Sequence, residues 1–516
     1  MKKNILLCFF LVGLVFFSGC IRANEFSEYP GISVSEHAPE EPYPYDDNEV
    51  QQLTEYRAAA DPGGYYFIQK AAFRDPDDPD KTKEGNLLCY YDLEAAETVL
   101  LCTNTACRHE SESCEAYLYT EPMDRATIGK WLINCTHYKL FYYDDHLYML
   151  TKDRNFDSYL NCYDRDYTNE KQGICLTKSA ASPRSLLTEP GSSLIFNGWF
   201  YYLNFQYDEN CSGERSQGKD TVFSFCRVRI DGSGEVENLY EFSFPADYAG
   251  FMNVGSGMAF QILQSGGDVF CIAAASYRDD QTKDQTEQRV IRYNDRDGAK
   301  LVWNYSGNKI VNLMGAAGNG PVSAEESFMD ESQILYFISE PNSEQQGTAI
   351  SSVDLKTGEG KSLYSSTLGV ISQLRTDGEH IFFMEGSVTR QYLTAIDKSG
   401  KLLRRYCFEY TEEQEEHVRK VEANGGVEPI PEELKDLVNE ESMGNIQALP
   451  DSDRAELLVT DSRYLMIADL NCFVFRDLLP AEGAYRNTYA VGIGLISTED
   501  FLRGTEVKIR KINLWD

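Results

Sequence analysis

Histidine is scarce in this chain of 516 residues, with only 6 His, and proline is sparse at 17. Basic residues are in the minority too: 48 Lys and Arg stand against 82 Asp and Glu, so the formal net charge is −34. A charge of this sign repels phosphate backbones, because nucleic-acid binding depends on Lys and Arg that neutralise phosphates. The composition therefore argues against nucleic acid as a partner and favours a soluble monomer.

Familiar catalytic and binding motifs are also missing. The stretch "MNVGSGM" lacks the strand-to-helix setting of a nucleophile elbow, and "GAAGNG" lacks the glycine order and βαβ setting of a dinucleotide-binding loop. The acidic stretch 74–85 lacks the Asp-x-Asp-x-Asp-Gly spacing of a calcium loop. His137, His146 and His380 lie near apparent strands, where a packed or hydrogen-bonded histidine is the ordinary case. No catalytic residues are predicted, and a role other than catalysis is favoured.

The amino terminus has the pattern of a secretory signal peptide over residues 1–20. Two lysines precede the apolar stretch 5–17, and Ser18-Gly19-Cys20 follows it. In a helix this stretch rises about 20 Å, which is short of the roughly 30 Å hydrocarbon core of a membrane. Its end resembles the bacterial lipobox, in which the cysteine receives diacylglycerol and becomes the new amino terminus. That resemblance implies lipidation of Cys20 and anchoring to the cell membrane on the extracytoplasmic side.

Residues 21–60 are predicted to form a flexible tether. The segment 24–49 is acidic, contains four prolines and shows no apolar periodicity. Such a composition favours an extended, mobile chain. The tether would hold the remainder of the protein away from the membrane.

From about residue 63 onward, a turn signal followed by an aromatic-rich strand recurs along the chain. The seven occurrences are "GGYYFIQ", "DDHLYML", "NGWFYYL", "GGDVFCI", "ESQILYFI", "DGEHIFFM" and "DSRYLMIA". In most units a second strand follows and ends at a turn that contains Asp, as in "SSVDLKTGE" and "TAIDKSGK". Asp can bond the backbone two residues on and a following Gly accepts positive φ, so these turns predict β-hairpins.

A repeated hairpin unit along one chain predicts an all-β fold, with a single β-propeller of about seven blades over residues 61–516. The 33 Tyr and 27 Phe favour strands as well. A pair of β-sandwiches is the alternative, since it would also alternate strands and turns. A small helical insertion is expected at 411–447, because Thr411 and Gln414 form a capping box and Pro431 begins a second helical pattern.

Side chains that could bind a metal are concentrated in the segment "LCTNTACRHESESCEAYL", which contains Cys102, Cys107, His109 and Cys114. Three thiolates and one imidazole satisfy the tetrahedral preference of Zn²⁺. Four protein ligands would close the coordination shell, so this would be a structural zinc site. The Cys-x4-Cys-x-His-x4-Cys spacing differs from the usual Cys-x2-Cys knuckle.

A disulfide within this group is the alternative, because an exported chain meets conditions in which thiols oxidise. Twelve cysteines remain of the 14 when Cys8 in the signal peptide and Cys20 are set aside. An even number permits full pairing, but buried free cysteines also behave as small apolar residues. Zinc, a local disulfide and unpaired thiols therefore all stay open at this stage.

The lipobox, the aromatic hairpins and the cysteine segment together resemble TolB-like β-propeller lipoproteins of Gram-positive anaerobes. Cys102, Cys107, His109, Cys114 and Ala116 match the segment that recurs after the first blade in that group. The resemblance implies a surface-anchored propeller and no established reaction.

We expect a lipid-anchored, monomeric binding or scaffold protein for an extracellular protein, peptide or glycan. A secreted polysaccharide hydrolase or lyase with a site in the central channel is the alternative.

Overall fold

The computed structural model describes residues 54–512, apart from several connections between strands, of which 424–463 is the longest. The predicted signal peptide 1–20, with Cys20, and most of the predicted tether lie outside the described residues. Among the residues that are described, no helix is long and apolar enough to span a membrane.

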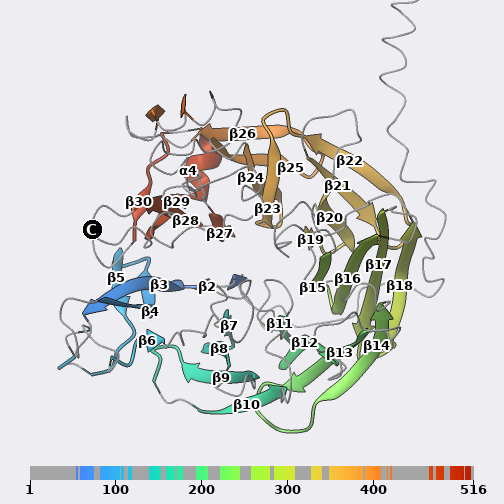
Figure 1. The fold of residues 1–516 in the computed structure, drawn as a ribbon, viewed down its shortest axis with the longest axis horizontal. Coiled ribbons are helices and arrows are strands. Elements are labelled where there is room, and N and C mark those ends of the chain that lie inside the picture. Colours follow the sequence, from blue (N-terminus) through green and yellow to red (C-terminus); the bar gives the residue numbers. More distant parts are fainter. Residues whose placement is uncertain are drawn as a thin grey trace, which may run out of the picture.

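The described strands form seven antiparallel sheets, which follow one another around a ring (Figure 1). The first sheet has six strands: β1 (Thr54–Glu55), β2 (Ala58–Asp61), β3 (Gly64–Arg74), β4 (Thr82–Asp92), β5 (Glu97–Leu100) and β6 (Tyr117–Leu118). The second sheet contains β7 (Lys139–Tyr143), β8 (His146–Lys152), β9 (Ser158–Asp164) and β10 (Lys171–Thr177). The third contains β11 (Ser193–Phe196), β12 (Trp199–Gln206), β13 (Thr221–Arg229) and β14 (Glu237–Phe244).

The remaining four sheets are four-stranded as well. The fourth contains β15 (Gly257–Ser265), β16 (Asp268–Arg278), β17 (Asp284–Asn294) and β18 (Gly298–Gly307). The fifth contains β19 (Ser327–Met329), β20 (Ile334–Ser339), β21 (Ala349–Asp354) and β22 (Gly360–Ser365). The sixth contains β23 (Val370–Thr376), β24 (His380–Gly386), β25 (Gln391–Asp397) and β26 (Leu402–Cys407). The seventh contains β27 (Tyr464–Ala468), β28 (Cys472–Pro480), β29 (Tyr489–Ser497) and β30 (Arg510–Lys511).

This architecture is a β-propeller, as the sequence predicts, and it excludes the pair of β-sandwiches. The prediction of about seven blades compares with six regular blades and one irregular sheet. Six sheets are regular four-stranded blades, whereas the first sheet has six strands. The difference arises because β1 is added on one side of this sheet, and because β5 and β6 both pair with β4 on the other side.

The core is divided into seven apolar clusters, and each lies between two neighbouring sheets. Alternate residues of one strand therefore serve two clusters, because successive side chains in a strand point to opposite faces. In β12, Tyr201 and Leu203 face the fourth sheet, whereas Phe200 and Tyr202 face the second. This two-sided burial explains why the first strands of the repeats read as continuous aromatic runs rather than as alternating patterns.

The Asp-containing turns of the sequence close hairpins as predicted. The Asp354 carboxylate accepts hydrogen bonds from the backbone N–H groups of Lys356 at 2.7 Å and Thr357 at 3.2 Å. The Asp397 carboxylate accepts one from Ser399 N–H at 2.9 Å, and Gly400 follows with a φ of 90°. A residue with a Cβ is disfavoured at such a φ, which explains the glycine.

The tether is shorter than predicted, because its last residues are folded. Residues 54–61 contribute β1 and β2, and Ala58, Ala59 and Ala60 are buried. Three small apolar residues allow this segment to pack closely against its neighbours. The prediction missed this strand because the acidic, proline-rich residues before it indicate an extended chain.

Helix is rare in the described chain. One short helix, α4 (Thr498–Arg503), lies in the last sheet, with Ser497 accepting a capping hydrogen bond from Asp500 N–H. Within the predicted insertion 411–447, the described residues Glu415, Glu416, Arg419, Lys420 and Ala423 are helical. The rest of that insertion, including the predicted second helix, lies outside the described residues.

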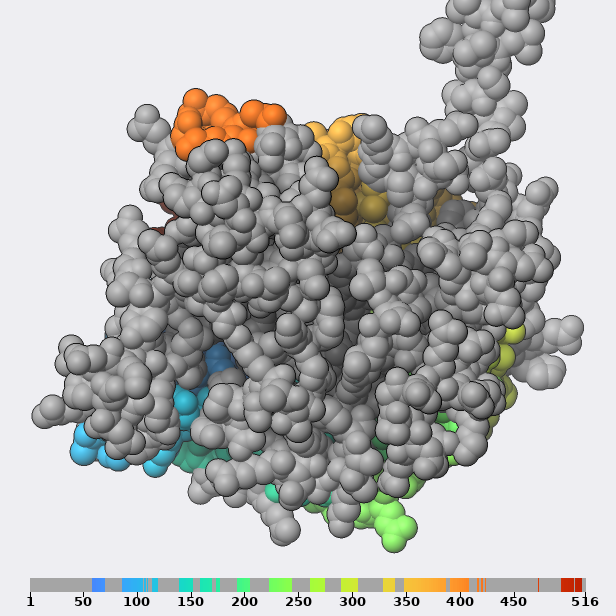
Figure 2. Space-filling model, in the orientation of Figure 1, coloured from blue at the N-terminus to red at the C-terminus, as the bar shows by residue number. Residues whose placement is uncertain are grey.

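The ring closes where the seventh sheet meets the first. Among the described residues the first sheet uses only 54–118 and the seventh only 464–511, so no strand is exchanged between them. Figure 2 shows residues of the first sheet, in blue, at the rim of the disc. We call the contact between these two sheets the closure junction.

Candidate metal centre

The cysteine segment forms a loop that interrupts the outer strand of the first sheet. β5 pairs with residues 89–92 of β4, and β6 pairs with Asn86 and Leu87 further along the same edge. Leu88, between them, fastens both ends of the loop: its carbonyl accepts from Leu101 N–H at 3.2 Å, and its N–H donates to Ala116 O at 2.8 Å. We call residues 101–116 the metal loop.

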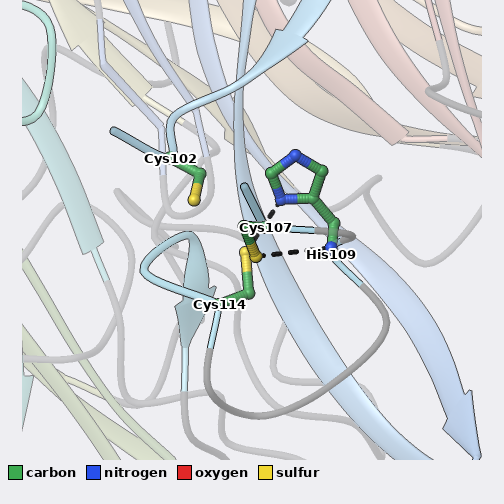
Figure 3. A group of neighbouring side chains, drawn as sticks. All are labelled: Cys102, Cys107, His109 and Cys114. Atoms are coloured by element: carbon green, nitrogen blue, oxygen red, sulfur yellow. Dashed lines mark hydrogen bonds between the residues drawn. The ribbon is translucent and has the colours of Figure 1, made fainter. Parts of the chain in front are cut away.

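The four predicted ligands converge within this loop. The Sγ atoms of Cys102, Cys107 and Cys114 and a ring nitrogen of His109 all lie within 4.8 Å of one another (Figure 3). His109 Nδ1 lies 3.2 Å from Cys114 Sγ, and the backbone N–H of His109 donates to Cys107 Sγ at 3.4 Å. The sequence prediction that these residues form one group is therefore supported by their positions.

Local backbone structure brings the ligands together. A turn places Cys107 after Asn104, because Cys107 N–H donates to Asn104 O at 2.9 Å and the Asn104 side chain accepts from Ala106 N–H at 3.0 Å. His109 has a φ of 56°, in the left-handed region. Histidine is one of the residues that tolerate this region best. A second turn, closed by Tyr117 N–H on Cys114 O at 2.9 Å, returns the chain to β6.

The arrangement fits a tetrahedral zinc ion. Zn–S bonds of about 2.3 Å and Zn–N bonds of about 2.0 Å imply separations of roughly 3.5–3.8 Å between ligand atoms. The ligand atoms here lie within 4.8 Å of one another. The longest separations between them would therefore have to shorten by about 1 Å when zinc binds. Three sulfurs and one nitrogen complete the shell, so a bound ion would be structural and would have no position for a substrate.

A polar contact braces the two ends of the metal loop. The Glu115 carboxylate accepts hydrogen bonds from the backbone N–H of Thr103 at 2.9 Å and from the Thr103 hydroxyl. These bonds hold the pKa of Glu115 below its ordinary value. Glu115 is next to one ligand and Thr103 next to another, so the contact fixes the distance between Cys114 and Cys102.

The thiols differ in environment. Burial, followed by contacts with Cys107 and Cys102, raises the pKa of Cys114 to about 12, although a backbone hydrogen bond from Ala116 acts in the opposite direction. At Cys102 burial acts in the same direction, but hydrogen bonds from the backbone of Asn104 and Glu115 outweigh it and lower the pKa. Cys114 is buried, whereas the other three ligands are half-buried. The site therefore has an inner side in the core and an outer side towards solvent.

No disulfide occurs among the ten cysteines within the described part of the chain. Cys89, Cys226 and Cys271 are buried and behave as small apolar residues. Cys135 and Cys211 lie outside the described residues.

The two described histidines outside the metal loop have structural partners, whereas His137 lies outside the described residues. His380 Nδ1 lies 2.9 Å from Asp377 Oδ2, and His146 Nδ1 lies 2.5 Å from Asp144 O. Each of these histidines is the first residue of a strand, β8 or β24, and bonds the turn before it, in agreement with the sequence interpretation.

The sequence did not reveal the polar networks between blades. Arg165 Nε lies 2.7 Å from Asp61 Oδ2, and this pair joins the first and second sheets. Arg227 lies 2.7 Å from Asp295 and joins the third and fourth. The partners are far apart in the chain, and no local spacing identifies them.

Comparisons with known proteins add context for the fold. No family model matches the chain, and no curated protein matches it in sequence. A solved structure of prolyl endopeptidases is similar over 90% of this chain and 50% of its own, with 10% identity and a TM-score of 0.44. The β-propeller domain of the Trilobed protease from Pyrococcus furiosus is similar over 91% of this chain and 98% of its own, with 9% identity and a TM-score of 0.41. The polysaccharide lyase Uly1 is similar over 90% of this chain and 94% of its own, with 9% identity and a TM-score of 0.41. This chain thus spans about half the length of the prolyl endopeptidase.

Proposed function

We propose that this protein is a lipid-anchored, extracytoplasmic β-propeller that binds one structural zinc ion in the metal loop. In this proposal it acts as a binding or scaffold protein for an extracellular protein, peptide or glycan. The observation that carries the proposal is the convergence of Cys102, Cys107, His109 and Cys114. Their chemistry favours zinc, and their number favours a structural ion over a catalytic one.

The buried carboxylates of the described residues also favour binding over catalysis. Asp61, Asp268 and Glu385 are each enclosed by partners that belong to the fold. Asp268 accepts from Asn294 at 2.5 Å and Gln333 at 2.7 Å, and Glu385 accepts from Thr394 at 2.7 Å and Arg405 at 2.8 Å. Carboxylates held in this way link strands and blades, so their hydrogen bonds serve the fold.

Elemental analysis of the full chain, purified without oxygen, tests the zinc site. We expect about one zinc per chain, and its loss in Cys107→Ser. Cys226→Ser is the matched control, because Cys226 is buried between the second and third sheets. Wild-type protein without metal, or equal loss in the control, would contradict the site.

Cell fractionation tests the anchor. Cys20→Ser should move the protein from the membrane to the soluble fraction, whereas Cys8→Ser should leave it on the membrane. Equal membrane association of the two variants would rule out lipidation at Cys20.

Incubation of the released Cys20→Ser protein with soluble cell-wall polysaccharide distinguishes a binding role from a hydrolase or lyase activity. The proposal expects the polysaccharide to be recovered unchanged. Shortened or unsaturated sugar products would replace the binding role by an enzymatic one.

A further inference from the structure

The closure junction is joined by a different kind of polar link from three other junctions of the ring. Arg227 joins the third and fourth sheets through Asp295, and Asp268 joins the fourth and fifth through Gln333. The fifth and sixth sheets share a network in which Tyr364 bonds Glu385 and Arg405. Each of these links includes a charged group at hydrogen-bond distance, and such bonds are the stronger ones.

At the closure junction, two hydrogen bonds from side chains of the described residues join the first and seventh sheets. The Thr98 hydroxyl donates to Ile512 O at 2.6 Å, and Arg510 Nη1 donates to the Tyr91 hydroxyl at 2.8 Å. Arg510 is charged, but neither bond has a carboxylate as its acceptor, in contrast to the three junctions above. No strand is exchanged here among the described residues, and an apolar cluster shared by the two sheets also holds them together.

The metal loop is part of that apolar cluster. Buried Cys114 and Ala116 belong to the same cluster as Cys472, Ile493 and Ile512 of the seventh sheet. Cys102 and Cys107 pack against its edge. Three of the four proposed ligands are therefore part of the apolar contact between the first and seventh sheets, or pack directly against it.

The loop also determines the position of the strands that contact the last sheet. It connects β5 to β6, and both pair with β4. Thr98 lies in β5 and Tyr91 in β4, so the strands that hold the loop also take part in these two hydrogen bonds to the last sheet. Order in the loop is therefore coupled, through β4 and β5, to contact with β29 and β30.

We propose that zinc in the metal loop closes the ring, so that its removal loosens the closure junction while the other junctions stay formed. This inference rests on the zinc binding proposed above. Metal binding contributes its free energy to the order of the segment that supplies the ligands. The segment here packs against the last sheet, so that free energy is shared with the closure junction.

Hydrogen–deuterium exchange of the full chain, followed by mass spectrometry, tests this inference. Zinc-loaded protein is compared with protein treated with a chelator, and with Cys107→Ser. We expect peptides from β4, β5, β29 and β30 to exchange at least about tenfold faster without zinc. Peptides from β16 and β17, on the opposite side of the ring (Figure 1), should keep their exchange rates.

A second variant separates the closure junction from the loop. Thr98→Val removes the hydrogen bond from Thr98 to Ile512 O without changing a ligand. The β29 and β30 peptides of this variant should therefore depend on zinc more strongly than those of the wild type. If zinc is bound but its removal leaves β29 and β30 unchanged, the closure role is wrong and the zinc site stands. If all peptides respond equally, zinc acts on the whole fold and the closure role is wrong again. If no zinc binds, the proposed site itself fails.

Discussion

Cys114 combines two roles in one side chain. It is a proposed zinc ligand, and it is also a buried member of the cluster between the first and seventh sheets, with 3% of its surface exposed. Cys102 shares the first role but is only packed against the edge of that cluster. Comparison of the two cysteines therefore separates metal binding from packing.

We predict that Cys114→Ser destabilises the protein more than Cys102→Ser when both are measured with chelator present. The serine hydroxyl at position 114 would be buried in an apolar cluster, at a cost of about 1–3 kcal/mol. At position 102 the change should stay within about 0.5 kcal/mol. Denaturant unfolding measures both values, and equal midpoints would show that Cys114 has no packing role.

Ala116 allows a test of the close packing beside the metal loop. It is fully buried, and its carbonyl accepts from Leu88 N–H. Ala116→Leu should lower stability by about 1–3 kcal/mol, because extra methylene groups have no space there. Ala95→Leu, at an exposed turn position, is the control and should have little effect. Thermal unfolding of the two variants distinguishes these outcomes.

The hairpin is the repeating element of the molecule, and its turns depend on glycine for two separate reasons. Gly400 and Gly378 both have positive φ, at 90° and 93°. A Cβ at Gly400 would lie 2.0 Å from Leu363 O, whereas one at Gly378 would meet nothing within 4 Å. Backbone conformation alone requires the second glycine, and close approach of another strand also requires the first.

We predict a larger loss of stability for Gly400→Ala than for Gly378→Ala. The Gly378 variant should lose about 1–2 kcal/mol, from the left-handed backbone alone. The Gly400 variant should lose at least about 1 kcal/mol more, because β22 must move to admit the methyl group. Chemical denaturation gives both values, and similar losses would show that the backbone conformation accounts for the whole effect.

At the scale of the whole molecule, polar pairs hold neighbouring blades in register. The Asp61 side chain has 0% exposure, and it receives Arg165 Nε at 2.7 Å, Gly63 N–H at 2.8 Å and the Tyr90 hydroxyl at 3.0 Å. Burial raises the pKa of Tyr90 to about 12, so this hydroxyl keeps its proton and donates.

Arg165→Met should therefore destabilise the protein by about 2 kcal/mol. The loss is smaller than that of a fully buried pair, because Arg165 is partly exposed and Asp61 keeps its other hydrogen bonds. Arg503→Met is the control, since Arg503 pairs with Glu499 on the exposed surface of α4. Its effect should stay below about 0.5 kcal/mol. Equal effects in thermal unfolding would contradict a special role for the link between blades.

The propeller and the ligand group could be predicted from sequence because both depend on local patterns. Hairpin turns need Asp and Gly at fixed positions, and the four ligands lie within one short segment. The six strands of the first sheet were missed because Ala58–Asp61 resembles neither an aromatic strand nor a turn. The link between the metal loop and Ile512 was missed as well, since nothing local relates the two ends of a ring.

X-ray absorption at the zinc edge, on full-length protein purified without oxygen, tests the central claim most directly. The account predicts bound zinc with three sulfur neighbours at about 2.3 Å and one nitrogen neighbour at about 2.0 Å. Protein that contains no zinc, and whose peptide spanning Cys102–Cys114 is lighter by two hydrogens, would show a disulfide in place of the metal centre.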